Sequence, residues 1–359
     1  MRNMRIIREK KMKTRIFPKH SEGSTLFAKN TRTLALGLAV SVAWAGQAAA
    51  NSEVNCAYPF WFGFAPAPVA DKMGFFEEEG IEFSYVYDND RANVYPALET
   101  GDINCTMRTI GEHMSRPLTA DSDTVVIGLI DVSVGADGVV AGPGIDSVED
   151  LIGKNFAGET GHPGILMTAH ALRAMGLSMN DVNVRLIATD DSPAVFEDED
   201  IAAVASWEPM LSEIAANTSR EGSKILLTSR EFEGLITDVV IVNKTDYIAN
   251  REKYAAFMRG IYRAVDLFNE DPEKFLELAA PEYDVTPDQM KADLAGVYYT
   301  SYEDAEEYFG TSGAEPKLKQ ITEDLVAINV DLDYMDAPIP YEAMVDPSLT
   351  EGLFDGAMR

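Results

Sequence analysis

Three aromatic side chains crowd one short segment near the first apolar run after residue 50. Trp61, Phe62 and Phe64 lie beside Gly63 and Pro66 in this segment. A loop of this composition between a strand and a helix is typical of the edge of a ligand cleft. An indole face there can stack on a planar ligand or hold an alkylammonium by cation–π attraction. Phe62 and Phe64 fit core packing equally well, so Trp61 is the stronger candidate contact.

A second candidate binding segment is Glu159-Thr160-Gly161-His162. It lies between an expected strand at 155–158 and an expected helix at 165–175. Backbone N–H groups at a helix N-terminus bind anions, and Thr160 adds a hydroxyl, so the segment suits a carboxylate or a sulfonate. The alternative is an ordinary helix cap with His162 exposed to solvent.

Polar residues also mark the ends of two further expected strands. Thr106 and Arg108 stand at the end of the strand expected at 103–107, and Arg108 either pairs with an anionic group or is a surface arginine. Ser206, Trp207 and Glu208 end the strand expected at 201–206 and open a helix. We expect Ser206 and Trp207 to face the cleft, while Glu208 either binds a cation or stabilises the helix start.

The composition excludes several classes of function. The 359 residues include 30 basic and 59 acidic side chains, a net charge of −29, which argues against nucleic-acid binding. The chain has two cysteines and four histidines, with no C-x-x-C or H-E-x-x-H spacing, so we expect no metal site and no catalytic constellation. The acidity indicates either a solubility adaptation to a saline habitat or a field that concentrates cationic ligands.

The first fifty residues differ from the rest of the chain. Ten Lys and Arg residues and only two Glu lie within residues 1–33, an apolar run follows at 34–46, and Ala48-Ala49-Ala50 completes an A-x-A site. This pattern predicts a secretory signal peptide over residues 1–50, cleaved after Ala50. The apolar run is too short to span a membrane, so we expect a soluble, exported protein.

From residue 55 onward, short apolar runs alternate with helical stretches, which predicts α/β layering. The first unit has expected strands at 56–60, 81–87, 103–107 and 124–132, with helices at 68–79 and 92–99. The second unit, starting near residue 142, has expected strands at 155–158, 182–188, 201–206 and 225–228, with helices at 165–175 and 210–216. A β-branched run at 239–242 leads back to the first unit, and amphipathic helices follow.

Two such units, with crossings near 132–142 and 235–243, predict a hinged clamshell. Each lobe is expected to be a doubly wound, mostly parallel sheet, with a helical C-terminal part. We assign residues 51–140 and 237–345 to lobe 1, residues 141–236 to lobe 2 and residues 346–359 to a C-terminal tail. Ligands in such sheets bind at the carboxyl ends of the strands, so two of these edges are expected to face each other across a cleft.

Several segments, in order and spacing, resemble one family. Residues 61–83 read WFGFAPAPVADKMGFFEEEGIEF, and further matches are Ala97–Ile103, the SVEDLIGK segment at 147–154 and the DIAAVASWEPML segment at 200–211. This pattern resembles the periplasmic solute-binding proteins of the nitrate/sulfonate/taurine type, which include thiamine-pyrimidine members of the NMT1 type. The resemblance covers residues 54–345 and implies a periplasmic-binding-protein clamshell, type II-like.

The resemblance implies a role and a ligand. It implies a monomeric periplasmic protein, without cofactor, that delivers a small solute to an inner-membrane ABC permease and its ATPase. Taurine-binding members have an acidic residue at a similar step of the return crossing, which implies that Asp238 receives a ligand ammonium. Aromatics, Glu208 and Asp238 predict an amino or quaternary ammonium group, and the anion site predicts an acid. A zwitterion such as taurine or a betaine has both groups.

Two questions remain open at this point. Cys56 and Cys105 fall in the first and third expected strands, adjacent in a 2-1-3 order, and form either a disulfide or two buried thiols. The alternative functions are an enzyme on the same fold, like pyrimidine-synthesising relatives that use a His and a cofactor, a thiamine-pyrimidine precursor-binding protein, or a sensor for a membrane receptor.

Overall fold

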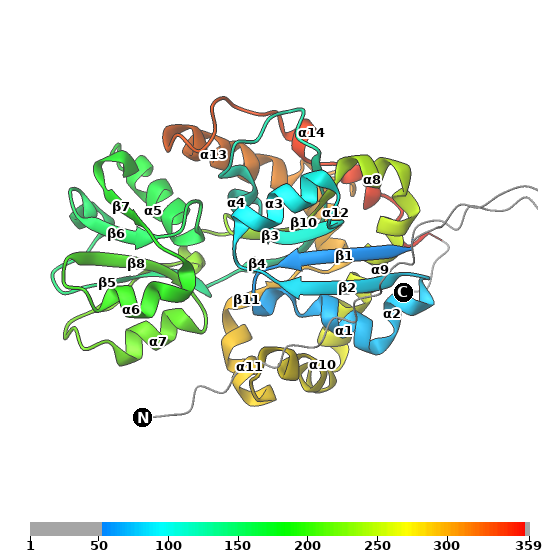
Figure 1. The fold of residues 1–359 in the computed structure, drawn as a ribbon, viewed down its shortest axis with the longest axis horizontal. Coiled ribbons are helices and arrows are strands. Elements are labelled where there is room, and N and C mark those ends of the chain that lie inside the picture. The colour runs from blue at the N-terminus through cyan, green and yellow to red at the C-terminus, as the bar shows by residue number, and fades with distance from the viewer. Residues whose placement is uncertain (1–51, 356–359) are drawn as a thin grey trace, which may run out of the picture. The chain divides into compact units, whose positions relative to one another are not determined.

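The structure is a computed structural model that describes residues 52–355. The expected signal peptide over residues 1–50 and the last four residues of the expected tail lie outside this range. The described residues form two β-sheets with helices packed on them, the α/β two-lobed architecture that the sequence predicts (Figure 1). In Figure 1 the N-terminal strands of the first sheet run from blue to cyan and the second sheet is green.

The first sheet has six strands in the order β11-β4-β10-β3-β1-β2. These strands are β1 (Glu53–Tyr58), β2 (Glu82–Tyr87), β3 (Cys105–Thr109), β4 (Thr124–Ser133), β10 (Thr237–Asn243) and β11 (Val297–Tyr299). The parallel neighbours β2, β1 and β3 confirm the expected 2-1-3 order. The returning strand β10 lies between β3 and β4 and is antiparallel to both, so the sheet is mixed.

The second sheet has five strands in the order β7-β6-β8-β5-β9. These strands are β5 (Asp137–Ala141), β6 (Asn155–Gly158), β7 (Asn183–Leu186), β8 (Ile201–Trp207) and β9 (Lys224–Thr228). Strand β6 is parallel to β7 and β8, whereas β5 is antiparallel to β8 and β9. The first crossing is therefore only residues 134–136, because β5 occupies much of the segment expected to be the connection.

Helices cover the sheets and make up the C-terminal third. They are α1 (Pro66–Met73), α2 (Phe75–Glu78), α3 (Arg91–Thr100), α4 (Ile110–Met114), α5 (Pro163–Ala174), α6 (Ser192–Phe196), α7 (Met210–Asn217), α8 (Lys244–Ala249), α9 (Arg251–Glu270), α10 (Pro272–Ala279), α11 (Pro287–Asp293), α12 (Tyr302–Phe309), α13 (Lys317–Asp331) and α14 (Tyr341–Met344). Gly74, with φ of +77°, divides the helix expected at 68–79 into α1 and α2 because it takes the left-handed conformation that ends a helix.

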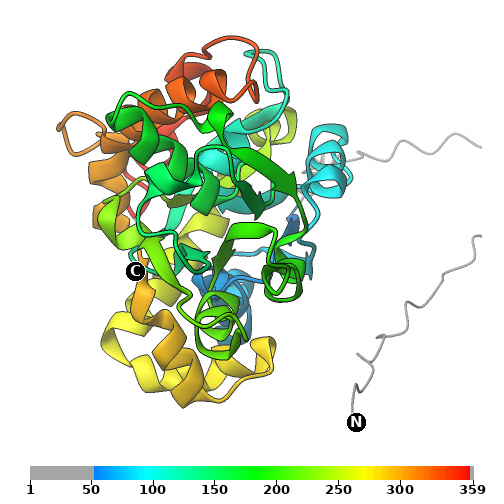
Figure 2. The same cartoon turned by 90° about the vertical axis from the view of Figure 1, so that its left-hand side faces the viewer.

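The long helix α9 shows why the C-terminal third packs onto the first sheet. Tyr254, Phe257, Ile261 and Val265 form an apolar stripe, all fully buried, that faces α1 and β4. The expected N-caps at Asp271 and Thr286 are present, since their side chains accept hydrogen bonds from the N–H groups of Lys274 and Gln289. Figure 2 shows the yellow segments around residues 250–290 below the second sheet and the orange C-terminal helices above it.

Cys56 and Cys105 form a disulfide between the paired strands β1 and β3. They are directly opposite each other in the register, with their Cα atoms 4.6 Å apart. A bridge that closes a loop of this length restricts the unfolded chain and stabilises the fold by ~4 kcal/mol in the chain-entropy description. Between residues 52 and 355, no helix is both long and apolar enough to cross a membrane.

Candidate functional site

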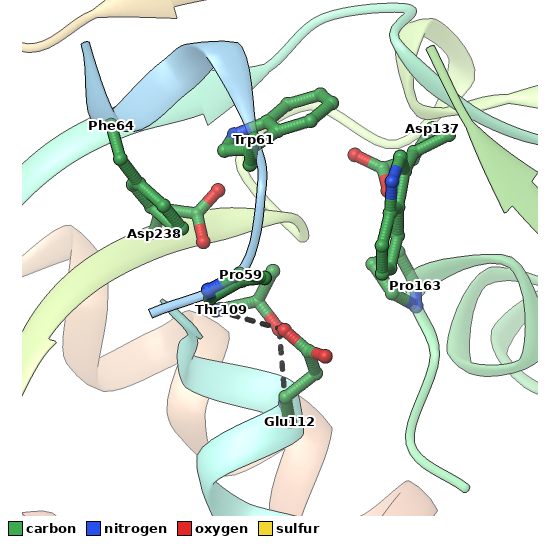
Figure 3. Close-up of a pocket in the computed structure, with 9 residues that line it drawn as sticks. Pro59, Trp61, Phe64, Thr109, Glu112, Asp137, Pro163 and Asp238 are labelled. Carbon is green, nitrogen blue, oxygen red and sulfur yellow. Dashed lines mark hydrogen bonds between the residues drawn. The ribbon is translucent and has the colours of Figure 1, made fainter. Parts of the chain in front are cut away.

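A small pocket lies where strand ends of both sheets meet (Figure 3). We call it the acidic pocket. Its lining residues are Pro59, Trp61, Phe64, Thr109, Glu112, Asp137, Pro163, Trp207 and Asp238. They follow the carboxyl ends of β1, β3, β6 and β8, or begin the reversed strands β5 and β10, which places them all at one edge of their sheet. The space in it that a water-sized molecule can occupy is about 20 Å³, so in this structure the two walls lie close together.

Trp61 is held in place by polar contacts on both of its ends. Its indole Nε1 donates to Asp131 Oδ1 at 3.4 Å, and its carbonyl oxygen accepts a hydrogen bond of 3.0 Å from the hydroxyl of Tyr283. Gly63 allows this approach, because a Cβ there would lie 2.2 Å from both Asp131 Oδ2 and Trp61 Nε1. The indole is therefore a fixed wall of the acidic pocket.

Trp207 forms part of the opposite wall and is backed by a histidine. The rings of His162 and Trp207 are stacked, with centroids 4.9 Å apart and an interplanar angle of 5°. His162 Nδ1 accepts a hydrogen bond of 3.0 Å from Gly164 N–H, and burial lowers the pKa of His162 to about 3. The imidazole is thus neutral and buried, which corrects the expectation of an exposed His162.

Two carboxyl groups of the first sheet interact beside Trp61. Asp131 on β4 and Asp238 on β10 are directly paired in the antiparallel register, and both are almost fully buried. Burial raises the pKa of both groups, and for Asp238 the negative charge of Asp131 raises it further. Two adjacent buried carboxylates repel each other, so the pair retains a proton at neutral pH, with Asp238 as its main holder.

A third carboxyl group faces the pocket from the second sheet. Asp137 is the first residue of β5, where its N–H donates to Ser133 Oγ at 3.1 Å. Burial raises the pKa of Asp137 to about 8, and the charges of Glu112, Asp131 and Glu208 add to this effect. Figure 3 shows Asp137 on the opposite side of the pocket from Asp238.

Arg108 is engaged by the protein itself. Its guanidinium is fully buried, lies 3.5 Å from Glu112 Oε1, and donates to the carbonyl oxygens of Asp88 and Asn89 at 3.1 Å each. Its Nε and Nη1 have no hydrogen-bond partner among the described residues. Burial therefore corrects the surface-arginine alternative, while pairing with a ligand anion stays a prediction. Among the described residues that line the acidic pocket there is no Lys, Arg or His.

The segment expected to bind an anion, Glu159 to His162, lies away from the pocket lining. At the start of α5, Gly164 N–H is used by His162 Nδ1, and the N–H groups of residues 165 and 166 both donate to His162 O. Glu159 accepts from Thr189 and lies 3.3 Å from Arg91. The N–H groups of residues 162 and 164–166 are therefore occupied, and neither Glu159, Thr160 nor His162 lines the pocket.

Four other candidates have structural contacts instead. Phe62 packs on Tyr283 with ring centroids 4.9 Å apart, and Thr106 is buried within β3. Ser206 shares a 2.9 Å hydrogen bond with Ser192. Glu208, whose peptide bond to Pro209 is cis, accepts from the N–H and hydroxyl groups of Ser212 at 3.1 and 2.6 Å, which corresponds to the helix-start alternative. None of these four lines the acidic pocket.

The sequence-predicted residues that meet around one cavity are Trp61, Phe64, Trp207 and Asp238. Sequence reasoning missed the carboxyl groups of Glu112, Asp131 and Asp137. Asp131 had a visible signal, because it interrupts the otherwise apolar run of β4. Asp137 had none, because the strand that it begins was assigned to a connection.

Polar contacts also join the two sheets' loops at one side of the pocket. Arg91 Nε lies 3.3 Å from Glu159 Oε1, and Asn89 Nδ2 donates to both carboxylate oxygens of Asp190 at 3.0 and 3.2 Å. Asn89 precedes α3 on the first sheet, while Glu159 and Asp190 follow strands of the second sheet. These contacts hold the two walls of the pocket together in this structure.

The comparisons with known proteins agree with this architecture. A sequence model of the family described as NMT1/THI5 like matches residues 61–275. A protein of Brucella abortus (strain 2308) that is named provisionally as a binding protein is 24% identical over 257 residues, which is 70% of this chain and 78% of that protein.

Solved structures have a similar fold. The periplasmic aliphatic sulphonate binding protein SsuA from Escherichia coli has a TM-score of 0.56 at 17% identity, covering 73% of this chain and 91% of that one. The periplasmic nitrate-binding protein NrtA from Synechocystis PCC 6803 has a TM-score of 0.63 at 13% identity, covering 85% and 89%. The desulfurization enzyme DSZB has a TM-score of 0.58 at 14% identity, covering 84% and 99%. The fold thus hosts binding proteins and an enzyme.

Proposed function

This chain belongs to the NMT1/THI5-like family, and from that premise we propose that it is the solute-binding component of an ABC importer. It captures a small organic solute that carries a positively charged nitrogen and delivers it to a membrane permease. The protein acts after export, in the periplasm, and releases its solute unchanged.

One observation supports the choice of ligand. The acidic pocket is lined by three aromatic rings and three carboxyl groups, and no Lys, Arg or His is among the described residues that line it. Indole and phenyl faces attract cations, and carboxylates do so more strongly. Sulphonate and nitrate, which the names of similar structures mention, are anions, and no cationic side chain lines this pocket among the described residues to pair with them. An amine or ammonium group is complementary to it.

Thermal unfolding of the full chain against a panel of solutes tests this proposal. The panel contains taurine, alkanesulfonates, nitrate, betaines, amino acids, alkylamines and thiamine pyrimidines. Binding to the folded state alone raises the melting temperature by mass action, so a cation-bearing solute at a hundredfold excess over its Kd stabilises by ~2.7 kcal/mol. A shift produced only by nitrate and alkanesulfonates would contradict the proposed ligand class.

A second measurement separates binding from turnover and tests delivery. The solute that shifts the melting temperature is incubated with the protein and then followed by NMR, where an unchanged spectrum is expected. Uptake of the same labelled solute should fall in cells that lack this protein. Chemical conversion of the solute would instead favour the enzyme alternative.

A thiamine-type pyrimidine remains the second candidate, because two indoles face the pocket. Trp61 and Trp207 offer flat surfaces for a heteroaromatic ring, and Asp137 and Asp238 can accept hydrogen bonds from ring amino groups. This candidate is a member of the same panel. A shift by the pyrimidines without one by aliphatic amines would select it.

A further inference from the structure

The polar groups that face the acidic pocket are mainly carboxyl groups, which accept hydrogen bonds and, while protonated, can also donate one. Asp238 reaches it from β10, Asp137 from β5 and Glu112 from α4. Two donors that line the pocket are already used, since Thr109 Oγ1 donates to Glu112 Oε2 at 3.3 Å and Trp61 Nε1 donates to Asp131. Arg108 Nη1 lies behind Glu112, 3.5 Å from its Oε1. A solute that fills this pocket displaces water from the carboxyl groups, so it must replace the hydrogen bonds that water made.

Asp131 lies behind this lining and acts through Asp238. It is fully buried, one of its oxygens accepts only the long bond from Trp61, and its Oδ2 has no hydrogen-bond partner among the described residues. Its carboxyl group interacts with that of Asp238. Asp131 is therefore a positioning residue: it shares the proton of the pair and sets how readily Asp238 becomes a carboxylate.

The charged and titratable groups around these carboxyls come from several elements. Glu112 on α4 and Glu208 after β8 raise the pKa of Asp137, and Tyr299 on β11 lies near Asp131. His162, stacked behind Trp207, is neutral. The one close arginine, Arg108, contacts Glu112. A cation that enters the pocket is thus the group that can convert the protonated carboxyls to carboxylates.

These contacts distinguish two kinds of cation. A quaternary ammonium brings charge and methyl groups that suit the aromatic rings, but it has no N–H to donate, so the carboxyl groups of Asp137 and Asp238 would lose their water without replacement. A primary ammonium or an amidinium brings the same charge with several N–H donors pointing in different directions.

Resting on the proposed function, we propose that the ligand's charged nitrogen carries at least two N–H groups, one donated to Asp238 on the first sheet and one to Asp137 on the second. Quaternary ammonium compounds are therefore poor ligands. Because the two acceptors belong to different sheets, such a nitrogen also bridges the two walls of the pocket. On binding, protons leave the carboxyl groups for the solvent.

Matched pairs of probes test this inference by isothermal titration calorimetry on the full chain. The pairs are ethanolamine and choline, taurine and its N,N,N-trimethyl derivative, and glycine and glycine betaine, with acetamidine as the planar donor. In at least one pair we expect the N–H member to bind ten or more times more tightly than its trimethyl partner. In Tris and phosphate buffers, whose ionisation enthalpies differ, the heats should show the release of about one proton.

The outcomes separate this inference from the proposed function. A trimethyl compound that binds as tightly as its partner, or binding without proton release, overturns the inference and leaves a cation-binding protein. Absence of binding by every cation overturns both. Asp131→Asn should still bind the N–H probes but with a smaller release of protons, whereas Asp121→Asn, an exposed control, should match the wild type. An unchanged proton count in Asp131→Asn would contradict the role of Asp131.

Discussion

The acidic pocket and the neighbouring arginine flank differ in whether their carboxyl groups have a cationic partner. In the flank, which we define as Arg91, Arg108 and Arg116 with their partners, each arginine faces a glutamate: Arg91 and Glu159 at 3.3 Å, Arg108 and Glu112 at 3.5 Å, and Arg116 and Glu99 at 2.6 Å. In the pocket and directly behind it, Asp137, Asp238 and Asp131 are more deeply buried than Glu99 or Glu159, yet no described arginine or lysine forms an ion pair with them.

This difference indicates where the molecule leaves room for a ligand. A buried carboxylate is costly unless a cation and hydrogen bonds compensate it, and in the flank the chain supplies that cation itself. In the pocket the compensation is absent and the carboxyl groups hold protons instead. Glu112 belongs to both regions, because it lines the pocket and pairs with Arg108. Groups of this kind cluster at functional sites.

Removing a cation from the flank should have the largest effect on stability. Arg108→Met leaves Glu112 buried without its partner and two backbone carbonyls without their donor. We expect the free energy of unfolding to fall by ~3–5 kcal/mol, measured by urea denaturation. The control Arg185→Met changes an exposed arginine and should cost under ~1 kcal/mol. An equal loss of stability in both variants would show that Arg108 does not compensate the buried charge of Glu112.

Removing a carboxyl group from the pocket should increase the stability of the ligand-free protein. Asp238→Asn keeps the shape of the side chain but removes the charge that burial and Asp131 disfavour. We expect the ligand-free protein to unfold at a higher temperature at pH 8, while affinity for an N–H cation falls at least ~100-fold, which is ~2.7 kcal/mol. Asp121→Asn is the matched control. A variant that is less stable and still binds the cation would contradict the view that this carboxyl group costs stability and serves binding.

The flank and the pocket also differ in how far the sequence predicts them. Order and type of most elements followed from apolar runs and caps, so the α/β architecture, the 2-1-3 strand order and the N-caps at Asp271 and Thr286 are confirmed. Residues at strand ends were candidates for the cleft because parallel strands share an edge. That rule identified Trp61 and Trp207, and the family resemblance identified Asp238; all three line one pocket.

What the sequence could not predict depends on contacts between distant segments. Arg108 and Asp137 are 29 positions apart in the sequence but belong to neighbouring regions of the fold. Only the folded structure shows that Arg108 forms an ion pair with Glu112, whereas no cation among the described residues is close enough to lower the pKa of Asp137. The reversed strands β5 and β10 bring their first residues to the same edge as the ends of the parallel strands. A rule that considers only strand ends therefore misses Asp137.

A third change tests whether the pocket wall needs its glycine. Gly63→Ala places a Cβ 2.2 Å from both Asp131 Oδ2 and Trp61 Nε1, so the indole or the carboxyl group must move. We expect a loss of ~1–3 kcal/mol in the free energy of unfolding and a weaker affinity for the cation probe. Gly63→Ser should cost more, because its side chain is larger. If both variants behave like the wild type, Trp61 is not a fixed wall.

The smallest expected effect is a pH dependence of the free energy of unfolding that comes from Asp137 in the pocket. The carboxyl group of Asp137 is ionised in the unfolded chain above about pH 4 but keeps its proton in the folded protein up to about pH 8. Between these values the unfolded chain binds fewer protons, so this group lowers the free energy of unfolding by ~1.4 kcal/mol for each pH unit gained, and the loss stops above pH 8.

The pH test compares wild type with Asp137→Asn in the ligand-free state. From pH 6.8 to 7.8, we expect the wild type to lose ~1 kcal/mol more than the variant, measured by urea unfolding at each pH. His162 does not interfere in this window, because its pKa of about 3 in the folded protein places its effect below about pH 6.5. Asp121→Asn should keep the slope of the wild type. Equal slopes for wild type and Asp137→Asn would mean that Asp137 is already ionised, and the contrast with the arginine flank would then rest on Asp131 and Asp238 alone.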